Sequence, residues 1–159
     1  MCIRDSSKSV RPLDISGIEG LVIIYAKCCC PIPGDSIIGY MSSGRGMTVH
    51  RTSCSNVLNS PKTSVNSSNW IIVKWSRTIK GEFQSEVQIK TMNRVGLLAE
   101  VASKISSKKS NINHVKVETD GDDSILVFGL SVRNRRHLAN VLRSIRNNAD
   151  VIRVNRVVG

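Results

Sequence analysis

Hydrophobic and polar positions follow a strand period in one stretch of the second half of the chain and a helical period in the next. Between residues 83 and 91 apolar and polar side chains alternate, as in a strand with one buried face. Apolar residues then recur three and four positions apart, which predicts a helix. The predicted elements are a strand at 83–91, a helix at 97–105, strands at 113–118 and 125–132, a helix at 138–145 and a strand at 151–157. This βαββαβ order predicts a ferredoxin-like unit, in which an antiparallel sheet carries both helices on one face.

Finer features of this unit follow from the same pattern. Val115 and Val117 occupy alternate positions of a predicted strand, so we expect both to face inward. Asn93 is a candidate N-cap for the first helix, and Leu142 belongs to the apolar stripe of the second. The Asp-Gly-Asp-Asp run at 120–123 predicts a hairpin turn.

The first half of the chain is less regular and predicts short strands, turns and little helix. Thr52 or Ser53 can cap a short helix that continues to about Leu58. The stretch at 59–69 is rich in Ser and Asn and predicts a surface loop. The remaining predicted elements are strands at 21–26, 36–41, 47–50 and 70–75 and a hairpin loop at 42–46.

Two units, at residues 12–80 and 81–159, are therefore expected in an α+β chain of 159 residues. Hydrophobic residues make up 40% and aromatic residues 4%, so the core must consist mainly of Ile, Val and Leu. No apolar run approaches the roughly 18 residues of a membrane-spanning helix, and we expect no membrane partner. The opening residues match nothing in the rest of the chain, so we expect 1–11 to be non-native or disordered and the chain to be the tail of a longer protein.

The formal net charge of +11 is concentrated in two stretches and predicts a polyanionic partner. Residues 36–81 contain six Lys or Arg and no acidic residue. Residues 133–156 contain seven Arg and the single acid Asp150. Because aromatic residues are scarce, we expect recognition of phosphates and shape, as on folded RNA, rather than base stacking.

The densest chemical signal in the sequence is a group of soft metal ligands. Four of the five cysteines and one of the three histidines lie within 27 positions. His50 and Cys54 are four apart, a ligand spacing, and a closed set of four Cys or His ligands leaves no open position for catalysis. Spacing by itself favours Cys28 with Cys30 over Cys29, because neighbouring side chains of an extended chain point to opposite faces. The choice among the three cysteines stays open, and buried reduced thiols are the alternative to a metal site.

These motifs together resemble the C-terminal regulatory region of RelA/SpoT-type (p)ppGpp synthetase/hydrolases. The residues that carry the resemblance are Ala26-Lys27-Cys28-Cys29, the Pro-Ile-Pro-Gly-Asp run at 31–35, Gly44-Arg45-Gly46, the stretch from His50 to Cys54, and the βαββαβ unit. The resemblance implies a small β-rich zinc-knuckle unit, the conserved-cysteine or zinc-finger domain, followed by an ACT domain. It maps structural zinc onto Cys28, Cys29, His50 and Cys54. The family commonly carries Arg or Gln at the position of Cys30.

The resemblance also implies a function without catalysis in this chain, in which we find no P-loop and no nucleophile or general-acid pair. The parent would be a GTP pyrophosphokinase, a (p)ppGpp 3′-pyrophosphohydrolase or both, acting in the stringent response in the cytoplasm. This end would contact ribosomal RNA and tRNA and signal to the upstream catalytic domains. We expect phosphate contacts from Arg45 on the hairpin tip, Arg51 between two ligands, and Arg143 and Arg146 on the second predicted helix.

An amino-acid sensor is the alternative function, because ACT domains commonly hold an amino acid at a strand-to-helix turn and can form a homodimer. In this chain the corresponding turn contains Asn93, Arg94, Gly96 and Leu97. Gly96 would let backbone amides approach a carboxylate, or it is needed only for the turn. The two functions differ in salt dependence, since only RNA binding should weaken steeply as salt is raised.

Overall fold

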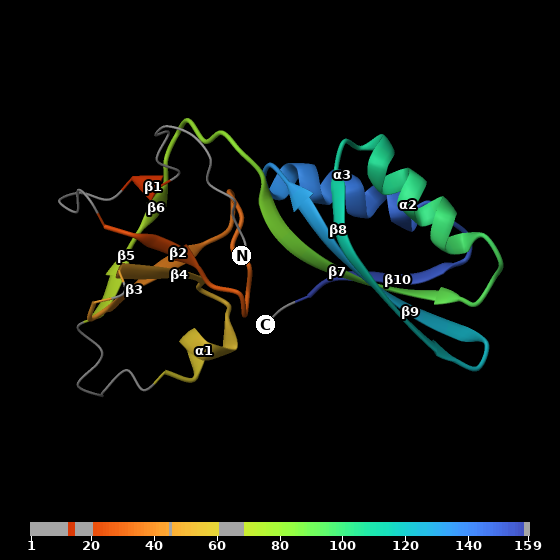
Figure 1. The fold of residues 1–159 in the computed structure, drawn as a ribbon, viewed down its shortest axis with the longest axis horizontal. Helices are drawn as coiled ribbons and strands as arrows, with labels where there is room; N and C mark the ends of the chain where they lie inside the picture. The colour runs from red at the N-terminus through yellow and green to blue at the C-terminus, as the bar shows by residue number, and fades with distance from the viewer. Residues whose placement is uncertain (1–12, 15–20, 45, 61–68, 158–159) are drawn as a thin grey trace. The chain divides into compact units, whose positions relative to one another are not determined.

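The structure is a computed structural model that describes residues 13–14, 21–44, 46–60 and 69–157, and it divides the chain into two compact units (Figure 1). The first unit ends at Gly81 and the second comprises Glu82–Val157. Residues 1–11, expected to be non-native or disordered, and Arg45, expected to bind RNA, lie outside the described residues, as does most of the predicted loop at 59–69.

The first unit is a small mixed sheet with a two-stranded addition. Its elements are β1 (Leu13–Asp14), β2 (Ile23–Tyr25), β3 (Ile37–Ser42), β4 (Gly46–Arg51), α1 (Ser55–Leu58), β5 (Trp70–Ile72) and β6 (Lys74–Trp75). The four-stranded sheet has the order β2-β4-β3-β5, in which β2 runs parallel to β4, and β1 pairs with β6. The single strand predicted at 70–75 is therefore two strands that belong to different sheets.

The β3–β4 hairpin depends on Gly46, which has a φ of 91°. A Cβ at this position would run into the carbonyl oxygen of Val22, so only glycine allows β2 to approach the start of β4. The core behind the sheet contains Ile32, Met47 and Val49, all fully buried. This small core has limited area to bury, as expected for a unit of this size.

The second unit is the predicted ferredoxin-like βαββαβ fold. Its elements are β7 (Phe83–Met92), α2 (Leu97–Ser107), β8 (Asn111–Asp120), β9 (Asp123–Val132), α3 (Arg135–Arg146) and β10 (Val151–Arg156). The sheet order is β10-β7-β9-β8 with every neighbouring pair antiparallel. Both helices cover the same face of this sheet (Figure 1). The α+β fold class expected from the sequence is confirmed.

The core of the second unit lies between that sheet face and the two helices. Alternate residues of β7 are buried and each lies opposite a buried residue of β9, as in the pair Val87 and Phe128. The helices contribute the buried side chains of Leu97, Val101, Ile105, Leu138, Val141 and Ile145. Leu142, which we placed on the apolar stripe, is only half-buried. The core is aliphatic apart from the two Phe residues of β7 and β9, in line with the composition.

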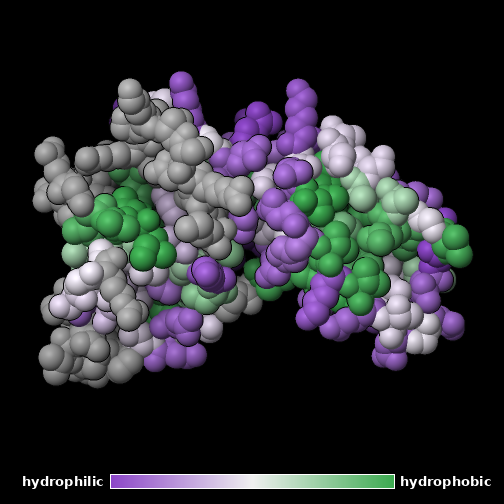
Figure 2. Space-filling model, viewed as in Figure 1, coloured by the Kyte–Doolittle hydropathy of each residue, from purple (hydrophilic) through white to green (hydrophobic). Residues whose placement is uncertain are grey.

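Val115 and Val117 lie on the predicted face of the sheet, but their side chains are not buried as expected. They pair with the buried residues Phe128 and Leu126, so they lie on the helix side of the sheet. Nevertheless their side chains are 42% and 48% exposed, because β8 is the edge strand. Apolar side chains of the second unit reach the surface among polar ones (Figure 2).

Both predicted helix caps were wrong. The N-cap of α2 is Gly96 in a left-handed conformation, not Asn93, whose amide instead donates to the carbonyl oxygen of Asp122. The N-cap of α1 is Cys54 rather than Thr52 or Ser53. Asn93 still bonds to the β8–β9 hairpin and the turn follows it at 95–96, whereas Thr52 and Ser53 form the turn after β4, so each helix begins later than predicted.

We predict that Leu97→Ala lowers the free energy of unfolding of the second unit by about 2–5 kcal/mol, since this side chain is 3% exposed. The matched control is Leu98→Ala, one position along the same helix, where the side chain is 43% exposed and the loss should be much smaller. Urea unfolding followed by circular dichroism measures both. Equal losses in the two variants would show that this face of α2 is not the core face.

Candidate metal centre

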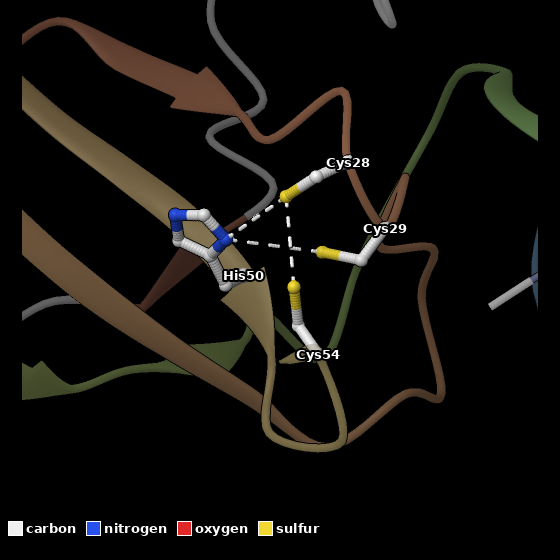
Figure 3. A group of neighbouring side chains, drawn as sticks. All are labelled: Cys28, Cys29, His50 and Cys54. Atoms are coloured by element: carbon white, nitrogen blue, oxygen red, sulfur yellow. Dashed lines mark hydrogen bonds between the residues drawn. The ribbon is translucent and has the colours of Figure 1, made fainter. Parts of the chain in front are cut away.

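Four potential metal ligands converge in the first unit from two separate segments of the chain (Figure 3). Cys28 and Cys29 lie in the turn that follows β2. His50 is the next-to-last residue of β4, and Cys54 is the N-cap of α1. Parallel pairing of Tyr25 in β2 with Val49 in β4 brings the two segments side by side.

The cysteine turn lets adjacent side chains share one centre. Cys30 has a φ of 41°, in the left-handed region, and its amide donates to the carbonyl oxygen of Ala26 at 2.9 Å. The chain is therefore tightly turned at Cys28 and Cys29, and the opposite-face argument for an extended chain does not apply. This conformation decides a question that spacing left open, namely which two of the three consecutive cysteines lie together with His50.

The four ligand atoms lie close to the spacing of a tetrahedral site. All lie within 4.8 Å of one another. The Cys28 sulfur is 3.6 Å from the Cys54 sulfur and 3.4 Å from Nδ1 of His50, and the Cys29 sulfur is 4.0 Å from the same nitrogen. Ligand bonds of 2.0–2.3 Å around a tetrahedral zinc ion imply ligand–ligand separations of about 3.5–3.8 Å. Three sulfurs and one imidazole nitrogen therefore suit a zinc ion in chemistry, and small side-chain movements would bring all of them to its ligand spacing.

Cys30 does not belong to this group. Its sulfur points to the carbonyl oxygen of Lys27 at 3.5 Å. None of the four described cysteines forms a disulfide, and the 3.6 Å separation of the Cys28 and Cys54 sulfurs is far longer than the roughly 2.05 Å of such a bond.

Burial and hydrogen bonding shift the titration of three of these groups. Burial raises the pKa of the Cys29 thiol to about 12, although the amide of Arg51, which donates to its sulfur, acts in the opposite direction. The pKa of Cys54 is lowered overall. Burial by itself would raise it, but hydrogen bonds from the Asn56 amide and from the neighbouring thiols outweigh the effect of burial. The pKa of His50 is lowered by burial, which favours the neutral imidazole that can bind a metal. A bound cation would reverse the unfavourable shift at Cys29, because a coordinating thiol is deprotonated.

The arginines expected to bind RNA are placed differently from one another. The Arg51 side chain is only 16% exposed and lies 3.7 Å from the Asp35 carboxylate, so its charge is engaged inside the unit. Arg146 donates to the carbonyl oxygen of Val154 on β10. Arg143 is exposed on α3.

The candidate amino-acid loop is held by contacts within the second unit. Arg94 donates to Asp150 at 2.7 Å and to Glu100 at 2.9 Å, so its side chain ties the loop to α2 and to the start of β10. Hydrogen bonds to these two carboxylates raise the pKa of Arg94, and the bond to Glu100 has the larger effect. Gly96 has a φ of 82°, as the turn requires, and Leu97 is buried in the core.

Asp35, the last residue of the Pro-Ile-Pro-Gly-Asp run, has a role that the sequence pattern did not indicate. Its side chain is 4% exposed. An acidic residue directly after a proline–glycine turn was the available signal, but its partner is 16 positions away and only the fold shows it.

Among the described residues, no helix combines the length and apolar character that crossing a lipid bilayer demands.

Comparison with protein families identifies both units. The model of the RelA/SpoT RIS domain matches residues 13–76, and the model of the ACT domain matches residues 80–156.

Individual relatives extend across almost the whole chain. The bifunctional (p)ppGpp synthase/hydrolase SpoT of Escherichia coli K12 is 37% identical over 155 residues, which are 97% of this chain and 22% of that protein. The bifunctional (p)ppGpp synthase/hydrolase RelA of Mycobacterium tuberculosis is 32% identical over 146 residues, 91% of this chain and 19% of that protein. The chain spans about a fifth of the length of these relatives.

Among solved structures, the ACT domain from the GTP pyrophosphokinase of Chlorobium tepidum superimposes with a TM-score of 0.44 at 18% identity, covering 48% of this chain and all of that domain. At this level the likeness adds no argument, and the assignment depends on the family models and the sequence relatives. The chain belongs to the RelA/SpoT family, of which it carries the RIS domain followed by the ACT domain.

Proposed function

We propose that this chain is the non-catalytic regulatory part of a cytoplasmic (p)ppGpp synthetase/hydrolase of the stringent response, that it binds structured RNA of the ribosome and tRNA, and that it passes this signal to upstream catalytic domains. The observation that carries the proposal is similarity over 97% of the chain to only 22% of a bifunctional synthase/hydrolase. The two matched domains occupy residues 13–76 and 80–156, and neither is a catalytic domain.

A structural zinc ion is part of this proposal. Cys28, Cys29, His50 and Cys54 would hold it, and their separations support a closed tetrahedral set. When bound, zinc would supply folding energy to a unit whose own core is small, because metal binding and folding are coupled in such domains. The protein residues contribute the turn at Cys30 and the β2–β4 pairing, which hold the ligands close together.

The RNA partner is supported by the surface chemistry of α3. This helix carries four Arg and no acidic residue. Its buried side is apolar through Leu138, Val141 and Ile145, which leaves Arg143 at the exposed surface. A cationic surface without acids attracts phosphate and tolerates close approach of a nucleic-acid backbone.

The alternative function, an amino-acid sensor that acts through a homodimer, has one observation in its favour. The edge strand β8 exposes Val115 and Val117, and β9 is its one neighbour in the described sheet. An open edge with apolar side chains can pair with a second copy. Against the amino-acid ligand stands Arg94, whose guanidinium already bonds two carboxylates of its own unit.

We predict that freshly purified, reduced protein contains about one zinc ion per chain and that chelation loosens the first unit. Both tryptophans of the chain, Trp70 and Trp75, belong to this unit, and the Trp70 ring lies 6.0 Å from the His50 ring. Tryptophan fluorescence therefore reports on the metal centre while the second unit stays silent. Elemental analysis showing no zinc would refute the site.

Cysteine variants test which of the cysteines bind the zinc ion. Cys29→Ser should lose zinc, because it removes one of the four converging atoms. Cys30→Ser should retain zinc, because the Cys30 sulfur points to the Lys27 carbonyl oxygen. The reverse result, with metal lost only from Cys30→Ser, would mean that the ligand set is wrong.

RNA binding should weaken steeply as salt is raised. If about five cations neutralise phosphates, the logarithm of affinity should fall against the logarithm of salt concentration with a slope of roughly −3.5 to −4.5. Arg143→Glu should weaken binding and flatten the slope with little change in melting temperature, since this side chain is exposed. The matched control, Arg143→Lys, keeps the charge and should keep most of the affinity. Salt-insensitive binding would favour the amino-acid sensor instead.

A further inference from the structure

The metal ligands come from two segments, and one residue connects these segments directly. Arg51 lies between His50 and Cys54 in the second segment, and its backbone amide donates to the sulfur of Cys29 in the first at 3.3 Å. This bond continues the strand pairing after β2 has ended. Just after β2 the Ala26 amide donates to the Val49 carbonyl oxygen. Further along β4, the Arg51 amide donates to a cysteine sulfur in place of a backbone carbonyl oxygen.

The side chain of Arg51 makes a second connection to the cysteine segment through Asp35. Nε of Arg51 is 3.7 Å from Oδ2 of Asp35, and the two side chains are 16% and 4% exposed. The same carboxylate oxygen accepts from the Ile32 amide at 2.9 Å. Asp35 is therefore fixed to the turn that directly follows the cysteines and cannot move without moving that turn.

The backbone of Asp35 is anchored as firmly as its side chain. Its amide donates to the Ile32 carbonyl oxygen at 3.0 Å, and its own carbonyl oxygen accepts from Nε1 of Trp75 at 3.0 Å. Gly34, with a φ of 100°, permits the tight turn between Ile32 and Asp35. Asp35 thus presents a fixed carboxylate against which the Arg51 guanidinium is oriented.

We propose that Asp35 and Arg51 form a clasp that sets the position of the Cys29 sulfur relative to His50 and Cys54, and that both are positioning residues for the metal centre. This inference rests on the proposed function, because it assumes that the four ligands bind a metal. The ion pair holds the end of β4 against the cysteine turn, and the Arg51 amide then orients the Cys29 sulfur. Partners outside the ligand set commonly tune a metal site in this way.

The energetics of the pair favour a role in geometry over a role in net stability. Removing two charges from water costs free energy that their attraction offsets only in part, so a buried ion pair is weak evidence of stabilisation. Nη1 of Arg51 is also buried with no hydrogen-bond partner among the described residues. Loss of Asp35 would leave the guanidinium buried without its counter-charge, and the end of β4 would then move.

Competition with a chromophoric zinc chelator, on the whole chain, tests the clasp. Asp35→Asn should weaken zinc affinity about 10–100-fold, the range usual for partners outside the ligand set. Arg51→Lys keeps a cation beside Asp35, so it should lose less zinc affinity than Asp35→Asn, and it provides a second variant if Asp35→Asn does not fold. Cobalt substituted for zinc should show a changed ligand-field spectrum in Asp35→Asn, since the Cys29 sulfur is displaced.

The matched control is Val73→Ala, which removes a buried apolar contact of the same unit, where the side chain is 4% exposed. It should lower stability without changing zinc affinity in the folded state or the cobalt spectrum. Wild-type zinc affinity and an unchanged cobalt spectrum in both clasp variants would overturn the inference and leave the metal site standing. No metal binding by the wild-type chain would overturn both.

Discussion

The parallel pairing of β2 with β4 is the contact on which the candidate metal centre depends. Cys29 and His50 are 21 positions apart, and the parallel register that places Tyr25 opposite Val49 brings both segments to the same end of the sheet. Gly46 makes this approach possible because any side chain there would meet the Val22 carbonyl oxygen. A glycine in the hairpin thus controls the geometry of ligands at the other end of the strand.

The two units are stabilised in different ways. The second has a continuous core between one face of a four-stranded sheet and two helices, with fully buried Val, Ile, Leu and Phe side chains. The first has short strands, one single-turn helix and a cluster of three sulfurs and an imidazole where a larger domain would have more apolar contacts. Small domains commonly need a disulfide or a structural metal, because the apolar area they bury barely offsets the entropy lost on folding.

The positive charge of the chain is less available to a partner than its total suggests. Arg51 is paired with Asp35, Arg94 bonds Asp150 and Glu100, and Arg146 donates to a backbone carbonyl. These arginines connect elements within a unit, and carboxylates partly neutralise the charges of Arg51 and Arg94 there. The exposed cations of α3, among them Arg143, remain as the surface from which phosphate attraction can arise.

The sequence by itself determined the βαββαβ order and indicated the residue types of a candidate metal site, because periodicity and ligand chemistry are local properties. It could not choose between Cys29 and Cys30, since that depends on the left-handed turn at Cys30, nor assign a role to Asp35, whose partner lies 16 residues away. Val115 and Val117 show the same limit, because their alternation indicates a face while only the sheet order places β8 at an edge. Burial and ligand convergence depend on which distant segments pack together, and only the tertiary structure decided that.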